Sequence, residues 1–564
     1  MLLSIVNVEY NTKHNFCVYL YKKHIAHNIK SKLYINNIIK HYLHYIKQYV
    51  HYLLQKKLYT IKYNGLTIIG GIEMKLYKLL RDIDYMLVNG DVNNEITNIC
   101  YDSRKVKENS IFISINGNRF NGHEFINEAI KKGATAIVVE EEINIKNEDI
   151  ALIKVENTKI ALASMANLFY NESSKEIDLV GVTGTNGKTT VIHYVKDVLE
   201  AHEKSTGIIG TLGYELKDKE ISIEKINPTT PEALELQAIF REFINKGAEN
   251  VVMEVTSSAL MKHRVDYCDF NVGVFTNLSQ DHLEEHGTME NYKNEKIKLF
   301  HKCKLGVINL DDRIAEEIIE KATCEILTYG IRKEADIRAT EIRYKSDSVI
   351  FKVNFKEISE EIEVNIPGKF TVYNVLATIG ACHGLGIDIN EILKLISNIK
   401  HVPGRVEMVK NSLNKNVIVD YAHTPDALEK LLLMARDITD GKLITVFGCG
   451  GDRDKTKRKV MGMAAGILSD YCIITSDNPR NEDPIRIIEE IEDGMEIIDS
   501  KYEKIVDRRK AIEKALKILN DDDLLLIAGK GHEDYQIIGN VKMHFDDREV
   551  VKLILNNYKA IYIK

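Results

Sequence analysis

The sequence Leu179-Val-Gly-Val-Thr-Gly-Thr-Asn-Gly-Lys-Thr-Thr190 decides the fold class of this chain. Its apolar first part is typical of a buried parallel strand. A glycine-rich turn follows, and then a segment with apolar residues at helical spacing: Val191, Tyr194, Val195, Val198 and Leu199. Gly184 and Gly187 let the backbone curl so that its N–H groups point at phosphate oxygens. This strand–turn–helix order predicts a phosphate-binding loop in an α/β domain.

The loop is a variant of the common nucleotide-binding pattern, because Val182 stands where G-x-x-x-x-G-K-[ST] has its first glycine. Lys188 can reach the β and γ phosphates of ATP, and the Thr189 hydroxyl can hold Mg²⁺. A turn without function would not need Lys-Thr-Thr at the start of its helix. We predict that ATP is bound by Gly184, Thr185, Asn186, Gly187, Lys188, Thr189 and Thr190.

The composition is that of a globular protein with several domains. Its 564 residues exceed one ordinary core, and 44% of them are hydrophobic and 28% charged. A net charge of −7 gives no indication of nucleic-acid binding. The eight cysteines include no C-x-x-C pair, which favours reduced thiols over a disulfide framework or a zinc site. No apolar run approaches the roughly 18 residues of a membrane span. We expect a cytoplasmic monomer without a membrane span.

Apolar runs that alternate with helical patterns predict three α/β domains. Residues 74–177 form a small one, with strands expected at Ile111–Ser114 and Ala136–Val139 and a helix at Gly122–Lys132. Residues 178–400 form a central one with a mostly parallel sheet, with strands expected at Leu179–Thr183, Val251–Val255, Val272–Thr276 and Gly306–Leu310. Residues 401–564 form the third, with strands expected at Val417–Asp420, Leu443–Phe447, Cys472–Thr475 and Leu524–Ala528.

Residues 1–73 differ from the rest of the chain. They hold ten lysines, two glutamates and no arginine or aspartate. A helix at Tyr42–Tyr52 that binds a membrane surface or a partner is conceivable. We favour another hypothesis: the tetrapeptide Gly70-Gly71-Ile72-Glu73 corresponds to purine-rich codons placed where a ribosome-binding site would lie. Met74 would then be the true start, and residues 1–73 would not belong to the folded protein.

Polar residues follow two later apolar strands. Glu254 ends one of them, at the carboxyl edge where α/β sheets bind ligands, and its oxygens suit Mg²⁺. After the next strand, polar side chains crowd ten residues: Asn277, Asp281, His282 and His286. A lone histidine on a helix is usually structural, but this cluster favours a functional role.

These motifs, in this order, resemble the Mur ligase family: Thr183-Gly-Thr-Asn-Gly-Lys-Thr-Thr190, Thr229-Thr-Pro231, Glu254, Thr276-Asn-Leu with Asp281-His, and Asp420-Tyr-Ala-His-Thr-Pro-Asp426. The resemblance runs from about Met74 to the end. It implies a UDP-binding domain, a central ATPase domain and a C-terminal doubly wound, Rossmann-like domain for the incoming amino acid. It also implies that ATP phosphorylates the D-Glu γ-carboxylate of UDP-MurNAc-L-Ala-D-Glu, and that an amine attacks the acyl phosphate.

The resemblance also implies roles for single residues. Lys188, Glu254, His282 and Lys296 match catalytic positions. Thr189 matches a ligand of one Mg²⁺, and Glu254 and His282 match ligands of a second. Lys296 matches a lysine that CO₂ carbamylates, which turns a cation into an oxygen anion for Mg²⁺. Further ATP contacts are implied for Asn277, Asn374, Arg405, Asp420 and His423, and substrate contacts for Ser103, Thr229, Thr230, Ser257 and Arg264.

Ser476-Asp-Asn-Pro-Arg480 resembles the segment of family members that add meso-diaminopimelate. The far end of this amino acid carries a carboxylate as well as an ammonium, and Arg480 offers a fork for that carboxylate. Asp477 and Asn478 can take the ammonium. A charged hydrogen bond contributes roughly 1.5–3 kcal/mol, which favours diaminopimelate over lysine. The expected pocket consists of Arg453, Asp477, Asn478, Pro479, Arg480, Gly529 and Glu533.

Four alternatives remain open at this point. One is a catalytically inactive scaffold, which the presence of Lys188, Glu254 and His282 disfavours. A lysine-adding Mur ligase would have a pocket without Arg480. A ligase similar to folylpolyglutamate synthetase would share the ATP loop but lack Tyr101–Arg104 and Asp477–Arg480. A phosphate-loop NTPase of another class would hydrolyse ATP without a nucleotide-sugar peptide, and the first domain and Thr229-Thr-Pro231 argue against it.

Overall fold

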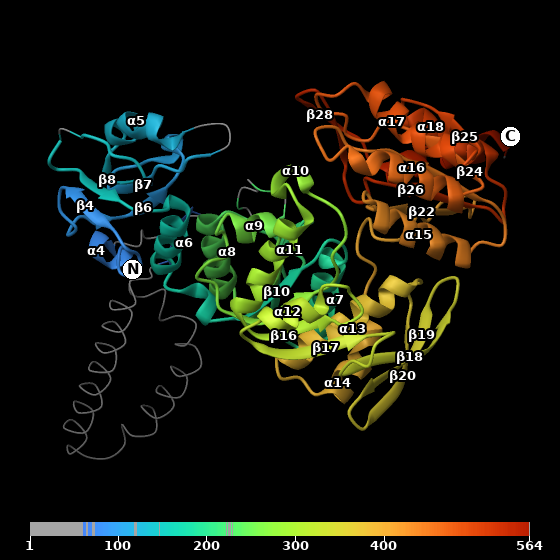
Figure 1. Ribbon diagram of the computed structural model, residues 1–564, viewed down its shortest axis with the longest axis horizontal. Coiled ribbons are helices and arrows are strands. Elements are labelled where there is room, and N and C mark those ends of the chain that lie inside the picture. Colours follow the sequence, from blue (N-terminus) through green and yellow to red (C-terminus); the bar gives the residue numbers. More distant parts are fainter. Residues whose placement is uncertain are drawn as a thin grey trace, which may run out of the picture. The chain divides into compact units, whose positions relative to one another are not determined.

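The structure is a computed structural model that describes residues 60–63, 66–69, 74–117, 121–145, 147–221, 223, 227 and 229–562 (Figure 1). Most of residues 1–73 therefore lie outside the described part, including the helix considered at Tyr42–Tyr52 and the segment before Met74. Within 1–73 the backbone forms one antiparallel pair, β1 (Thr60–Tyr63) with β2 (Leu66–Ile69).

The first α/β region is built on a five-stranded sheet. Its strand order is β4 (Met86–Asn89), β9 (Ala151–Lys154), β8 (Ala134–Val139), β7 (Ser110–Ile113) and β6 (Asn98–Cys100). β7, β8 and β9 run parallel, whereas β4 is antiparallel to β9. The expected helix is a 3₁₀ turn at Gly122–Phe125 followed by α5 (Ile126–Lys131). α6 (Thr158–Phe169) begins where the Asn157 side chain accepts two backbone N–H groups.

The central region is an eleven-stranded sheet. Its order is β13 (Lys219–Glu220), β12 (Gly213–Leu216), β11 (Thr206–Gly210), β14 (Asn250–Glu254), β10 (Asp178–Thr183), β15 (Phe270–Phe275), β16 (Cys303–Asn309), β17 (Glu325–Gly330), β18 (Ile337–Tyr344), β19 (Val349–Phe355) and β20 (Ile358–Val364). β11, β14, β10, β15, β16, β17 and β18 are parallel to their neighbours in this list. The outer strands are antiparallel.

Helices cover both faces of the central sheet. α7 (Lys188–Ala201), α13 (Lys369–Gly384) and α14 (Ile389–Leu395) share one apolar core with it. α8 (Ala233–Asn245), α11 (Met289–Ile297) and α12 (Ala315–Lys321) share the other. Two short helices, α9 (Ser257–Met261) and α10 (Leu283–His286), follow β14 and β15. Burial on both faces explains why the inner strands are continuous apolar runs.

The C-terminal region is a second doubly wound sheet. Its order is β21 (Glu407–Met408), β22 (Asn416–Asp420), β26 (Leu524–Ala528), β23 (Leu443–Phe447), β24 (Tyr471–Ile474) and β25 (Tyr502–Lys504), parallel from β22 onward. α15 (Pro425–Asp437), α16 (Thr456–Leu468) and α17 (Pro484–Ile497) pack on one face. α18 (Arg508–Ile518) and α19 (Asp547–Tyr562) pack on the other. β27 (Tyr535–Ile538) and β28 (Val541–His544) form a separate hairpin.

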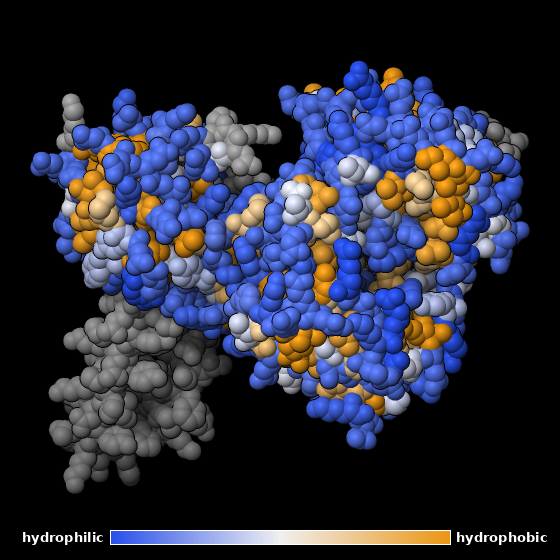
Figure 2. All heavy atoms as spheres, in the orientation of Figure 1, coloured by the Kyte–Doolittle hydropathy of each residue, from blue (hydrophilic) through white to orange (hydrophobic). Residues whose placement is uncertain are grey.

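The α/β fold class is confirmed, and each strand that the sequence predicted is present within a few residues of its expected limits. The strands β17 to β20 at the edge of the central sheet were not predicted. In the visible face of the described chain, hydrophilic residues predominate and hydrophobic ones form small patches (Figure 2). Among the described residues, no helix combines the length and apolar character of a membrane span.

Candidate active site

The phosphate loop connects β10 to α7 and depends on its glycines. Gly187 has φ +87°, and a β-carbon there would lie 2.8 Å from Asn374 Oδ1. Gly184 has φ +147°, and a β-carbon there would lie 1.9 Å from Thr276 Oγ1. Both positions therefore require glycine. The same close approach places Asn374, a predicted ATP contact, beside the loop.

Cationic side chains surround this loop. Lys188 Nζ donates to the carbonyls of Gly184 and Thr185, each at 2.9 Å. Arg405 Nη2 donates to Thr189 Oγ1 at 3.0 Å, although the two residues are 216 positions apart. Arg405 Nε is buried without a hydrogen-bond partner among the described residues. A buried cationic donor that lacks an acceptor fits an anionic ligand at this point.

Glu254 lies at the carboxyl end of β14 and is 1% exposed. Its Oε1 accepts from Thr189 Oγ1 at 2.9 Å and from the Thr211 backbone N–H at 2.8 Å. In the described chain, no three His, Cys, Asp or Glu side chains converge as a metal site. One carboxylate and one hydroxyl fit Mg²⁺ nevertheless, because this ion usually completes its shell with phosphate oxygens and water.

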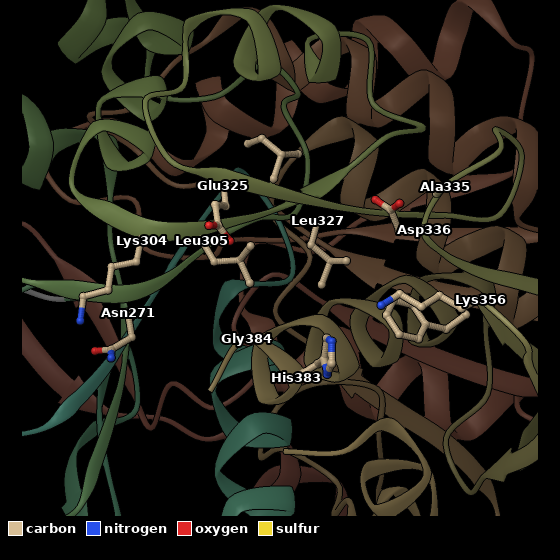
Figure 3. Close-up of a pocket in the computed structure, with 12 residues that line it drawn as sticks. Asn271, Lys304, Leu305, Glu325, Leu327, Ala335, Asp336, Lys356, His383 and Gly384 are labelled. Atoms are coloured by element: carbon tan, nitrogen blue, oxygen red, sulfur yellow. The ribbon is translucent and has the colours of Figure 1, made fainter. Parts of the chain in front are cut away.

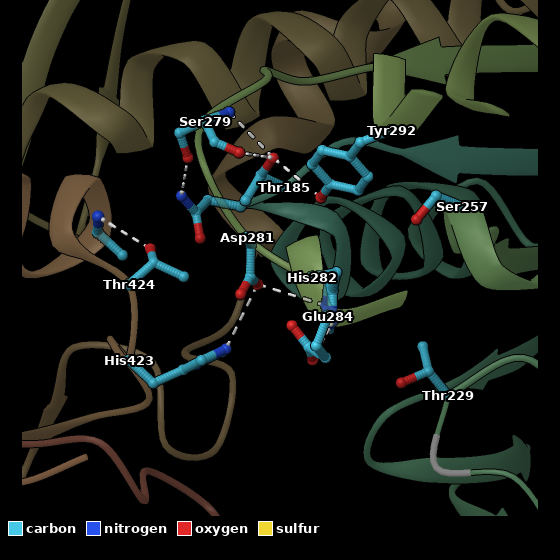
Figure 4. A network of polar contacts seen from close by, with 12 residues as sticks. Thr185, Thr229, Ser257, Ser279, Asp281, His282, Glu284, Tyr292, His423 and Thr424 are labelled. Atoms are coloured by element: carbon cyan, nitrogen blue, oxygen red, sulfur yellow. Dashed lines mark hydrogen bonds and ion pairs between the residues drawn. The ribbon is translucent and has the colours of Figure 1, made fainter. Parts of the chain in front are cut away.

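His282, which the sequence predicted as a metal ligand, lies just before α10. Its ring pairs with Asp281 at 3.3 Å and with Glu284 at 3.7 Å (Figure 4). Its backbone has φ +54°, which turns the chain just before α10. Burial alone would raise the pKa of Asp281, but His282, His423 and Lys457 lower it to about 2. Asp281 is therefore an anion at this end of the sheet, with His282, His423 and Lys457 around it.

Lys296 is fully buried on α11, and its Nζ donates to the Gly184 carbonyl at 2.9 Å. Burial and the nearby charge of Lys188 hold the pKa of Lys296 well below its ordinary value. Tyr292 lies beneath it, with the Lys296 amine 4.4 Å from the ring centroid. The Tyr292 hydroxyl and Thr185 Oγ1 are 3.1 Å apart (Figure 4). The loop and the Lys296 amine are thus held by the same aromatic residue.

The residues predicted to hold the sugar-peptide lie beside Glu254. Thr230 Oγ1 donates to the Glu254 carbonyl at 2.9 Å, and Thr229 Oγ1 lies 3.2 Å from Thr211 Oγ1. Arg264 binds Glu232 at 3.1 Å and the Thr230 carbonyl at 3.3 Å. The Ser257 hydroxyl and His286 Nε2 are 2.9 Å apart. Ser103 lies in the first region, where it is buried and its carbonyl accepts from Lys132.

The remaining residues that the sequence predicted to contact ATP are Asn277, His423 and Asp420. Asn277 Oδ1 accepts from the Asn186 N–H at 3.0 Å, which fixes the loop. His423 lies 3.9 Å from Asp281, and burial lowers the pKa of its imidazole to about 4. Asp420 accepts the backbone N–H groups of Val406 and Ala422, so its visible role is to hold the turn that carries Arg405.

The predicted amino-acid pocket is assembled between two loops of the C-terminal sheet. Arg480 has φ +50°, and its Nη1 donates to the Gly451 carbonyl at 2.8 Å. A β-carbon on Gly451 would lie 1.9 Å from the Pro479 carbonyl oxygen, so the close approach requires glycine. Arg480 and the exposed Arg453 flank Gly450. Asp477 Oδ2 would lie 2.6 Å from a β-carbon on Gly529.

A charged network connects residues of this predicted pocket. Asn478 Nδ2 donates to Glu533 Oε2 at 2.9 Å. Lys530 is fully buried and donates to the same carboxylate at 3.1 Å. Burial and the neighbouring Asp477 raise the pKa of Glu533. The sequence reasoning missed Lys530, although its position between Gly529 and Gly531 is a signal of a tight, polar turn.

Two further residues were missed as site members. Tyr292 lies on the same helix as Lys296, α11, and a single tyrosine in a helix carries no local signal. Lys457 is buried on α16, with its Nζ 3.8 Å from Asp281. It comes from a segment that the sequence linked only to Arg453. Long-range packing alone brings these side chains to the loop.

A cavity of about 790 Å³ lies elsewhere on the central sheet (Figure 3). Its lining includes Asn271, Leu305 and Glu325, which stand at the amino ends of β15, β16 and β17. The phosphate loop and Glu254 are at the carboxyl ends of the parallel strands. The cavity is therefore on the opposite edge of the sheet, and none of the predicted site residues lines it.

Comparison with known proteins agrees with this arrangement. Three family models match: "Mur ligase family, catalytic domain" at 95–170, "Mur ligase middle domain" at 182–382 and "Mur ligase, glutamate ligase domain" at 404–531. A Clostridium acetobutylicum protein named UDP-N-acetylmuramoyl-L-alanyl-D-glutamate–2,6-diaminopimelate ligase 2 is 66% identical over 482 residues, which are 86% of this chain and 100% of that protein. An Alkaliphilus oremlandii protein of the same name, without the number, is 46% identical and covers 85% of this chain and 98% of its own length. A solved structure titled with that ligase name has a TM-score of 0.62 at 30% identity, covering 86% of this chain and 99% of the other.

Proposed function

Because the chain belongs to the Mur ligase family, we infer that it is an ATP-dependent ligase of peptidoglycan synthesis. It joins 2,6-diaminopimelate to UDP-MurNAc-L-Ala-D-Glu through an amide bond. The observation that carries this conclusion is the 66% identity over the whole length of a relative named for that reaction. The pocket around Arg480 supports the same amino acid on chemical grounds.

The first step is phosphoryl transfer from ATP to the D-Glu γ-carboxylate. Two anions have to approach each other, so the site has to neutralise charge and position both groups. Backbone N–H groups of the loop and Lys188 bind the phosphates, and Arg405 completes the cradle from the C-terminal region. Its contact with Thr189 at 3.0 Å supports this role. We assign adenine to the neighbourhood of Asn374.

Thr189 and Glu254 are the residues that would hold Mg²⁺. When bound, the ion withdraws negative charge from the phosphate and carboxylate oxygens as they react. Thr189 Oγ1 and Glu254 Oε1 are 2.9 Å apart, so both oxygens can turn toward one cation. A second Mg²⁺ would be held by Glu254 and His282, as the family resemblance implies.

We propose that Lys296 acts as its carbamate. A neutral amine is the form that reacts with CO₂, and the lowered pKa of Lys296 supports its presence at neutral pH. The carbamate would place a negative charge beside Lys188, which removes the repulsion between two buried lysines. Tyr292 orients the side chain through its ring.

Thr229, Thr230, Ser257 and Arg264 hold the UDP-MurNAc-dipeptide at the edge of β14, and Ser103 contacts its UDP.

The incoming amino acid is meso-diaminopimelate. Its α-amine attacks the acyl phosphate, and the tetrahedral intermediate expels phosphate. At the far end of the amino acid, Arg480 and Arg453 bind the carboxylate. Asp477, Asn478 and Glu533 take the ammonium, with Pro479 and Gly529 shaping the pocket.

This pocket chemistry disfavours L-lysine, which lacks the second carboxylate and would leave Arg480 unpaired. A ligase similar to folylpolyglutamate synthetase is disfavoured because this chain carries the segments Tyr101–Arg104 and Asp477–Arg480. We further propose that the protein works as a monomer in the cytoplasm, where ATP is supplied. Domain limits at 74–177, 178–400 and 401–564 remain our proposal.

Phosphate release tests the function directly. The full chain is incubated with ATP, Mg²⁺ and UDP-MurNAc-L-Ala-D-Glu, with either meso-diaminopimelate or L-lysine added. We expect release only with diaminopimelate. Release with lysine alone would keep the ligase assignment and refute the pocket. ATP hydrolysis that is indifferent to the nucleotide substrate would refute the family mechanism itself.

A further inference from the structure

Two cysteines lie side by side at the amino edge of the central sheet. Cys303 opens β16, and Cys324 directly precedes β17, its parallel neighbour. Both side chains pack against the same apolar core of the sheet. The structure describes seven cysteines, all free, and among these only Cys303 and Cys324 are partly exposed. They are therefore the described thiols that a small reagent reaches most readily.

Two glycines make room for this pair. Gly273 of β15 and Gly306 of β16 are partners in register. A β-carbon on Gly273 would lie 2.8 Å from Cys303 Sγ, and one on Gly306 would lie 3.1 Å from Cys324 Sγ. A side chain at either position would push the thiols aside. The sheet surface is thus shaped to hold two sulfur atoms together.

The two thiols are chemically unequal. Hydrogen bonding between the two thiols lowers the pKa of Cys324 and raises the pKa of Cys303. The thiolate is the form that attacks disulfides, so Cys324 is the better nucleophile. A zinc site would need further ligands. In the described chain no third His, Cys, Asp or Glu joins the pair.

We propose that Cys303 and Cys324 form a dithiol that closes to an intramolecular disulfide by exchange with a low-molecular-weight disulfide. The Cys324 thiolate attacks one sulfur of the reagent and releases the other as a thiol. Cys303 then loses its proton to water and attacks the sulfur of Cys324, which releases the second thiol. Two protein thiols are oxidised, and one reagent disulfide is reduced to two thiols.

The bond would tie together the two ends of the segment that carries α12. This segment supports the candidate active site from outside. Its Glu317 pairs with Lys293 of α11 at 2.6 Å, one helical turn from Lys296. Its Asp312 accepts the Leu278 N–H at 2.9 Å, next to Asn277. Formation of the disulfide would therefore restrain the segment Cys303–Cys324, which contacts the candidate active site. Neither cysteine is itself a residue of that site.

The test uses the full chain in mixtures of reduced and oxidised glutathione. After acid quenching, the chain is unfolded, its remaining thiols are labelled with a maleimide, and its peptides are mapped by mass spectrometry. We expect Cys303 and Cys324 to lose label together, in a cross-linked peptide pair lighter by two hydrogen atoms. Cys268 and Cys382, which are buried, should keep theirs.

Variants separate the steps. Cys303→Ser should accumulate a mixed disulfide with glutathione at Cys324, because the resolving thiol is missing. Cys324→Ser should react at Cys303 at least severalfold more slowly. Cys382→Ser serves as the matched control and should form the cross-link normally. The proposal is overturned if the unmodified chain forms no Cys303–Cys324 cross-link, or if Cys324 stays unreacted in Cys303→Ser.

Discussion

Replacing Arg480 with alanine should separate diaminopimelate from lysine as substrates. Arg480 Nη1 already donates to the Gly451 carbonyl at 2.8 Å, which aims the guanidinium and leaves further N–H donors for a carboxylate. A charge-assisted hydrogen bond is worth about 1.5–3 kcal/mol, so kcat/KM for diaminopimelate should fall by about 10- to 150-fold. KM for ATP should stay unchanged, because the loop lies in the central region.

The fold should tolerate this change. Arg480 has φ +50°, and alanine also carries a β-carbon, so the backbone strain is the same in both proteins. Arg486 on α17 is exposed, and Arg486→Ala is the matched control without a kinetic effect. Phosphate release at varied diaminopimelate or L-lysine measures both substrates. If Arg480→Ala lowers kcat/KM for the two amino acids to the same degree, or changes kcat/KM for neither, then Arg480 does not bind the second carboxylate.

Three further outcomes are expected. In buffer depleted of CO₂, phosphate release should fall by about a hundredfold and recover when bicarbonate is added, because the carbamate of Lys296 supplies a charge that the reaction needs. The activity of Lys296→Arg should not recover with bicarbonate. A rate of phosphate release that does not depend on bicarbonate would contradict the carbamate. Tyr292→Phe removes the contact with Thr185, and the loss of about 1 kcal/mol in ATP binding free energy should raise KM for ATP about fivefold. The free energy of unfolding in urea titrations should change little. An unchanged KM for ATP would show that the Tyr292 hydroxyl does not position the loop. Arg508 and Asp547 form a fully buried ion pair at 2.7 Å. Arg508→Ala leaves the Asp547 carboxylate buried and unpaired and should lower the free energy of unfolding by about 3–5 kcal/mol, whereas the double variant Arg508→Met with Asp547→Leu should lower it by much less. Equal decreases in urea titrations of the two variants would refute this explanation.

Local patterns in the sequence were sufficient for the fold class and for the phosphate loop. Continuous apolar runs mark strands that are buried on both faces, and the glycines before Lys188 mark a backbone that has to turn sharply. Each of these two patterns covers only a few residues, so it can be interpreted without knowledge of the rest of the chain. The strands β18 to β20 escaped prediction because one face of this edge is half-exposed, and their residues alternate instead of forming a run.

The sequence by itself determined the fold class, and it predicted the chemistry of the site: a phosphate loop, a carboxylate at a strand end and an arginine that can bind a second carboxylate. Only the tertiary structure decided how these parts meet. Lys296 reaches the Gly184 carbonyl across 112 positions, and Arg405 reaches Thr189 across 216. The structure also paired His282 with Asp281, and it placed Cys303 at the start of β16 and Cys324 just before the neighbouring β17. Such contacts depend on strand order and helix packing, and these are properties of the whole chain that no local pattern encodes.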